Sequence, residues 1–414
     1  GRSSDRPERT ADVRRLLILA LLFGGLFLIL PLGSDGHGSR TLLTFGFLIL
    51  AAYSVGELAS QAGLPKIVGY LLAGVLFGPS GLGTVTALGV QRLTPISDLA
   101  IALIAFLAGT ELRWGEVRER GGALVRMLTA ELLLTFVALA GAVWLLQDAL
   151  PFLRDAEPAV VLAAAILFAS IAIVHSPAVT MALLSETGAR GPVASTTLGL
   201  VLLADIAVVL LFSGALALAR TIAPVDGGGA GLSVWLLVWE ILGAAVVGAA
   251  LGAAVATYLR FVGRELMLFA VLVAFFGLEI ARLAHVELLL TLLVAGFAAE
   301  NLSSHGDALR HAIERSAAPI FVVFFALSGA KIDLDTVVPL LPLVVPLAAL
   351  RAASIWAGTR IGGRWGGVPV AERRLVWIWT RSFVDWLRLW VWLAFGMVIY
   401  AFYGMRHSKL AKGE

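Results

Sequence analysis

The sequence predicts an all-α polytopic membrane protein, and its composition and its long apolar blocks carry this prediction. Of its 414 residues, 59% are hydrophobic and 14% are charged, whereas soluble domains carry about 25% charged residues. The block Leu16–Leu32 contains only glycine, proline and aliphatic or aromatic residues, and comparable blocks recur. A helix that spans a bilayer needs about 20 mostly apolar residues. The alternating pattern of an outer-membrane barrel is absent from the sequence.

The apolar windows predict about thirteen transmembrane helices separated by short polar breaks. Short connections favour compact antiparallel packing. The glycine-rich stretch Asp226–Gly231 lies in the longest break of the first 360 residues and divides the chain into two halves. The predicted spans are 16–33, 42–58, 66–78, 95–112, 124–147, 159–185, 192–219, 234–257, 265–283, 286–302, 316–331, 336–359 and 386–404.

The basic residues predict the orientation, with the N-terminus in the cytoplasm. Across the first twelve spans, nineteen basic residues fall on the N-terminal side of the membrane. Six fall on the other side: Arg40, Arg92, Arg154, Arg220, Arg282 and Lys331. This bias follows the positive-inside rule, so the basic pI of about 9.4 reflects topology and not a nucleic-acid partner. A thirteenth span would place Arg406, Lys409 and Lys412 outside, against the rule.

Ionisable side chains inside the predicted spans are the candidate functional residues, because each costs about 2.5–3.5 kcal/mol on insertion scales. Asp205 has no basic residue four positions away on its own helix, so it is either an ion-binding carboxylate or a neutral acid bonded to backbone. Arg351 is its predicted counter-charge or, equally, a structural clamp between helices. We interpret the other acidic candidates as structural, and Glu279 as the local partner of Arg282. The six candidates are Glu131, His175, Asp205, Glu240, Glu279 and Arg351.

A polar interruption at Ala169–Thr180 predicts a broken helix in the middle of the membrane. The proline of the His175-Ser176-Pro177 triplet removes a backbone donor. Two half-helices meeting there would present backbone carbonyls and a helix N-terminus to an ion. A simple proline kink is the alternative. Ser176 and His175 are therefore candidate ion- or proton-binding residues, with Thr180 and Glu131 as secondary candidates.

The sequence carries no sign of an enzyme, a cofactor or a resident metal. It contains no cysteine, P-loop, GxSxG or HExxH pattern. His175 has no other histidine or acid at metal-ligand spacing, so it either titrates near neutral pH or acts as a hydrogen-bonded spectator. The Gly74–Gly78 GxxxG pattern indicates close helix packing only.

Several motifs resemble the Kef/Nap-type monovalent cation:proton antiporters and occur in that family's order over residues 40–378. GLPKIVGYLLAGVLFGPSGLG resembles the family's opening hairpin, FLAGTEL its next helix, and LLADIAVV the helix that carries its ion-binding aspartate. VAGFAAENLSS and APIFVVFFALSGAKIDL resemble the inverted-repeat helices of the second half. The segment around Pro177 resembles the family's first discontinuous helix.

The resemblance implies two inverted repeats, over residues 40–219 and 234–378, in a homodimer of the bacterial inner membrane. It further implies that Asp205 alternately binds H⁺ and Na⁺ or K⁺, and that Arg351 is the family's basic residue. Ala204 stands where the family has Asp or Asn, so one-for-one electroneutral exchange is expected. His175 stands where the family has Thr, which leaves the transported cation open. A transport-inactive scaffold or sensor with the same fold is the alternative function.

The last part of the chain, residues 379–414, departs from the antiporter pattern. Six of the eleven tryptophans fall between Trp365 and Trp392. The segment Ser382–Leu410 resembles the C-terminal helix of cationic amino-acid transporters. The family's second broken helix and final core helix would stand here, so the sequence predicts an incomplete second repeat.

Overall fold

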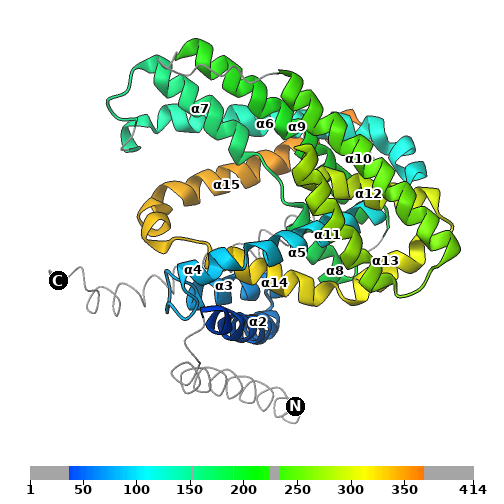
Figure 1. Cartoon of the computed structure of the whole chain (residues 1–414). Helices are drawn as coiled ribbons and strands as arrows, with labels where there is room; N and C mark the ends of the chain where they lie inside the picture. Colours follow the sequence, from blue (N-terminus) through cyan, green and yellow to red (C-terminus); the bar gives the residue numbers. More distant parts are fainter. Residues whose placement is uncertain (1–36, 151–152, 190, 224–233, 368–414) are drawn as a thin grey trace, which may run out of the picture.

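The computed structural model describes residues 37–150, 153–189, 191–223 and 234–367, and within these ranges every regular element is a helix (Figure 1). The alternation of apolar blocks and short polar turns is therefore realised as successive helices. The elements are α2 (His37–Gln61), α3 (Lys66–Phe77), α4 (Ala87–Arg92), α5 (Thr94–Thr110), α6 (Trp114–Leu145), η2 (Gln147–Ala149), α7 (Pro158–Ala172), α8 (Pro177–Thr187), α9 (Pro192–Ile222), α10 (Val234–Phe261), α11 (Leu266–Ala284), α12 (Leu288–Leu302), α13 (Gly306–Arg315), α14 (Ala317–Ala330) and α15 (Leu334–Trp365).

The predicted spans between residues 42 and 359 each coincide with a helix or, for 159–185, with the pair α7 and α8. Within the described residues, seven helices are long and apolar enough to cross a membrane, or eight if α13 and α14 form one bent span. Helices α3, α5 and α12 have only 12, 17 and 15 residues. The predicted count of thirteen spans is thus not confirmed. The windows 16–33 and 386–404, the Asp226–Gly231 break and the tail 379–414 lie outside the described residues.

The helices pack into two bundles (Figure 1). Helices α6, α7, α9 and α15 pack on one another and form the small bundle. Helices α2–α5 and α10–α14 form the large bundle, in which α12 packs between α5 and α10 and α14 packs on α3 and α5. Helix α8 contacts α9 of the small bundle and α3, α5 and α14 of the large bundle. The division into inverted repeats at 40–219 and 234–378 stays a prediction.

Glycines bring helix backbones of the large bundle into direct contact. A Cβ atom added at Gly74 of α3 would lie 2.1 Å from the carbonyl oxygen of Ala326 in α14. A Cβ atom added at Gly109 of α5 would lie 2.0 Å from the carbonyl oxygen of Leu293 in α12. The close packing that the Gly74–Gly78 pattern predicts is therefore confirmed. Such contacts favour helix association in lipid, where no hydrophobic effect holds helices together.

The structure adds two short helices, α4 and α13, in stretches that the hydropathy pattern treats as polar connections. In α13, Leu309 and Ile313 are fully buried and lie four residues apart on one face. The opposite face carries charged side chains, so the mean hydropathy of this helix is low although it packs against the large bundle.

Candidate functional site

The helix pair α7 and α8 is interrupted over Ile173–Ser176, where the sequence predicts a break. Pro177 occupies the first turn of α8, where its missing N–H leaves no bond unmade. The Ser176 hydroxyl accepts a hydrogen bond from the Val179 backbone N–H at 3.3 Å and caps α8. The two halves follow one another as a single candidate span, Pro158–Thr187. The predicted discontinuous helix is confirmed, with extended backbone at Ser176.

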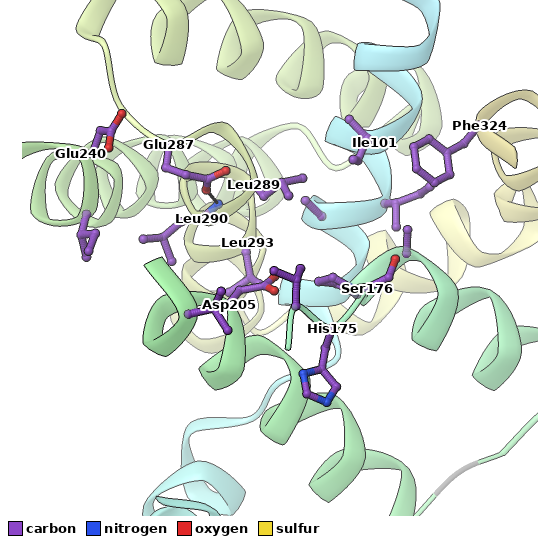
Figure 2. A pocket seen from close by; sticks show the side chains of 17 residues that line it. Ile101, His175, Ser176, Asp205, Glu240, Glu287, Leu289, Leu290, Leu293 and Phe324 are labelled. Carbon is purple, nitrogen blue, oxygen red and sulfur yellow. Dashed lines mark hydrogen bonds between the residues drawn. The ribbon is translucent and has the colours of Figure 1, made fainter. Parts of the chain in front are cut away.

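A cavity of about 400 Å³ lies beside this break, at the boundary of the two bundles (Figure 2). The break and α9 form its wall on the small-bundle side, and α5, α10, α12 and α14 form its wall on the large-bundle side. Most of its lining is apolar. The lining residues are Ile101, Ile104, Ala105, Val174, His175, Ser176, Pro177, Ala178, Asp205, Val208, Glu240, Ile241, Glu287, Leu289, Leu290, Leu293 and Phe324.

Asp205 is the acidic residue that α9 contributes to this cavity. Its side chain is half-buried, and the preceding Ala204 is fully buried. Figure 2 shows Asp205 on the cavity wall near Leu293 of α12. Among the described residues, Glu287 and His175 are the ionisable groups whose charges act on Asp205. No lysine or arginine of the described residues is among them.

Two further acids, Glu287 and Glu240, line the same cavity from the large bundle. The Glu287 carboxylate caps α12 by accepting the Leu290 backbone N–H, and its backbone N–H donates to the Glu240 carbonyl at 3.4 Å. Glu240 is exposed. Sequence reasoning missed Glu287, because an acid at the start of an apolar window has the ordinary role of a helix cap. Its position before an apolar helix was the available signal, but it did not indicate the cavity.

His175, Glu131 and Arg351 meet on the other side of the break. The His175 ring points away from Asp205 (Figure 2), and its Nε2 lies 3.3 Å from Oε1 of the fully buried Glu131 in α6. Arg351 of α15 donates from Nη2 to the Val174 carbonyl oxygen at 2.6 Å, and the Glu131 charge acts on it. The described residues contain no ion pair between Arg351 and Asp205. Arg351 thus contacts the backbone of the break, and its role as a structural clamp between helices stays a prediction.

Two remaining candidates lie away from the cavity. Thr180 does not line it, and its backbone N–H donates to the Ser176 carbonyl at 3.1 Å within the first turn of α8. Glu279 pairs with Arg282 at 3.1 Å, as predicted. Arg282 also contacts Asp98 of α5 at 2.6 Å, so this pair connects α11 to α5.

The cavity groups are suited to a cation and a proton. The Asp205 carboxylate, the Ser176 hydroxyl and the carbonyls of a discontinuous helix are the kinds of oxygen ligand that transporters use for Na⁺ or H⁺. Within the described residues, no cluster of His, Asp or Glu side chains could hold a resident metal ion.

Residues 45–403 match the family model described as "Sodium/hydrogen exchanger, transmembrane". The chain belongs to the sodium/hydrogen exchanger family. These exchangers are monovalent cation:proton antiporters, that is, integral multi-pass membrane transporters and not enzymes. The family match continues past residue 378, into the segment that the sequence pattern sets apart.

The fold of this exchanger is similar to that of the sodium proton antiporter MjNhaP1 from Methanocaldococcus jannaschii. The TM-score is 0.57, with 17% sequence identity, over 80% of each chain. At this identity the similarity concerns the fold.

Proposed function

We propose that this exchanger moves a monovalent cation, Na⁺ or K⁺, in one direction and H⁺ in the other, by alternating access at Asp205. The observation that supports this is that Asp205 shares a cavity with an interrupted helix and, within the described residues, has no lysine or arginine partner. A charge buried in this way needs a compensating ligand. A proton or a cation can each supply it, and competition of the two for one carboxylate produces exchange.

We also propose that the exchange is electroneutral. Ala204 leaves Asp205 as the single acid at its place on α9, so one proton would exchange for one monovalent cation. Glu287 is already engaged as the cap of α12. Ser176 would contribute its hydroxyl to the cation. His175 would take part through its backbone at the break, because its ring lies on Glu131.

The proposed route into the cavity passes Glu240 and Glu287. Glu240 is exposed and Glu287 lies between it and Asp205 (Figure 2), so a cation would meet negative charge before it reaches the site. With a cytoplasmic N-terminus, the connection that precedes Glu287 faces outward. The described arrangement would then be open to the outside of a bacterial inner membrane.

We further propose that the small bundle moves against the large bundle during transport, and that two copies associate through the large bundle. The cavity supports this division, because Asp205 and the break belong to the small-bundle side whereas α5, α10 and α12 close the opposite side.

Reconstituted vesicles with an internal pH indicator test the function. Addition of Na⁺ or K⁺ should drive proton movement in vesicles with the native protein, and Asp205→Asn should abolish it. Glu279→Gln is the matched control, since Glu279 is another carboxylate of an apolar helix that lies in an exposed local pair. Proton movement at the wild-type rate in vesicles with the Asp205→Asn variant would refute Asp205 as the ion-binding residue. A well-folded native protein with no flux would support the transport-inactive scaffold.

Electroneutrality is tested in the same vesicles by imposing a membrane potential. An electroneutral exchange should proceed at the same rate with and without the potential. A potential that drives net exchange would contradict the one-for-one stoichiometry.

A further inference from the structure

A second set of buried polar side chains lies behind the break, on the side opposite to the cavity. We call it the Glu131 cluster: Glu131 and Thr135 of α6, His175 of the break and Arg351 of α15. Glu131 and Thr135 are fully buried, and the His175 side chain is 7% exposed. The atoms without a hydrogen-bond partner are both carboxylate oxygens of Glu131, Oγ1 of Thr135, Nδ1 of His175 and Nε of Arg351.

Unpartnered atoms in such number are unusual, because most buried polar side-chain atoms in proteins are hydrogen-bonded. The helices that carry the cluster also pack closely. A Cβ atom added at Gly358 of α15 would lie 2.5 Å from the Glu131 Cα, so the backbones of α6 and α15 touch at this point. The chain keeps a preformed polar site here that its own hydrogen bonds do not fill.

The net charge of the cluster can change only by the gain or loss of a proton. Arg351 stays protonated at any physiological pH, and its positive charge balances the Glu131 carboxylate. Among the elements packed on Glu131, α15 contributes Arg351 and the break contributes His175, whose ring points away from Asp205 of α9 (Figure 2). A proton that the cluster gains or loses can therefore reside only on Glu131 or His175.

We propose that the Glu131–His175 pair is a second proton-binding site, separate from Asp205. In the deprotonated state, Nε2 of the neutral imidazole lies 3.3 Å from the Glu131 carboxylate without a hydrogen bond between them. One further proton from water binds on the Glu131 carboxylate and leaves by the reverse step. Only an O–H bond on that carboxylate forms or breaks. His175, which lines the cavity and keeps slight exposure, is the point of entry.

The proton on this pair is coupled to the ion site through the break. Arg351 donates to the Val174 carbonyl, and the Glu131 charge acts on its guanidinium from a distance. Protonation of Glu131 removes that charge and so changes the electrostatic environment of the bond between Arg351 and the break. The break and Asp205 line one cavity, so the proton affinity of the pair and the cation affinity of Asp205 change each other reciprocally. This coupling rests on the proposed function, whereas the proton site itself does not.

Infrared difference spectroscopy of the purified full-length protein, titrated with acid, tests the proton site without any transport measurement. In an Asp205→Asn background, a protonated-carboxyl band should remain and should disappear when Glu131→Gln is added. Adding Glu279→Gln instead is the control and should leave that band. If the bands of Asp205→Asn and of Asp205→Asn with Glu131→Gln are the same, the proposal is overturned.

A second variant keeps the proposal testable if Glu131→Gln fails to fold. His175→Gln in the Asp205→Asn background removes the imidazole and should change the proton affinity of the remaining band about tenfold. An unchanged affinity would also overturn the proton site. In the native protein, saturating Na⁺ should shift the titration of the Glu131 band relative to an impermeant organic cation. Absence of that shift would overturn the coupling, and Asp205→Asn should abolish the shift while it leaves the Glu131 band in place.

Discussion

The carboxylate of Glu186, near the end of α8, is expected to hold α8, which contacts both bundles, against α3 of the large bundle. Both of its oxygens lie 2.8 Å from the backbone nitrogen of Lys66, the first residue of α3. An anion at an exposed helix N-terminus contributes about 0.3–1 kcal/mol. Glu186→Gln keeps an acceptor oxygen but removes the charge. The observed arrangement should therefore lose population by about 2- to 5-fold relative to alternatives.

The absence of cysteine in the sequence allows a direct measurement of this shift. Leu145 at the end of α6 and Leu283 near the end of α11 are 81% and 79% exposed, one in each bundle. Spin labels on Leu145→Cys and Leu283→Cys report the distance between the bundles by pulsed electron resonance. Glu186→Gln should weaken the main distance peak, whereas Thr187→Val, on the same helix end, should not. Identical distributions for Glu186→Gln and the parent would refute the role of this contact.

Two further predictions concern stability and the break. Gly74→Ala should destabilise the α3–α14 contact by about 1–3 kcal/mol, because the new methyl group overlaps the Ala326 carbonyl. The melting temperature should fall by about 2–6 °C, while Gly141→Ala, which meets open space, should melt like the native protein. Arg351→Leu leaves the Val174 carbonyl without its donor, so amide exchange of the peptide containing Val174 should accelerate. Unchanged protection there would contradict the clamp.

Hydropathy alone predicted most of the helical segments and the break, because each is determined by a run of consecutive residues. The windows 66–78 and 95–112 fall within one or two residues of α3 and α5. The proline of the His175-Ser176-Pro177 triplet marks the start of α8. Helix α13 was not predicted from hydropathy, because only one of its faces is apolar. The number of membrane crossings did not follow, because α3 and α12 are too short to span a bilayer by their own length.

Residues of the candidate site could be predicted where one sequence segment indicates them. They could not be predicted where the packing of different bundles brings them together. Asp205 was identified because a lone acid in an apolar span needs a ligand. Glu287 and Glu240 share its cavity because α10 and α12 lie across the cavity from α9, an arrangement that hydrophobic periodicity does not predict. Whether Arg351 lies near Asp205, as a counter-charge, or away from it, as a clamp, likewise depends on the position of α15, which the sequence pattern does not give.

The extended backbone of the break explains how one short segment can contact both the cavity and the Glu131 cluster. Side chains that follow one another in an extended chain point to opposite sides, whereas neighbours in a helix are about 100° apart. Ser176, with φ −107° and ψ 107°, lines the cavity, and the preceding His175 ring lies on Glu131. A continuous helix could not place these neighbours on opposite sides. We infer that the interruption matters less for its free carbonyls alone than for joining the cavity that Asp205 lines to the cluster around Glu131 through Val174, His175 and Ser176.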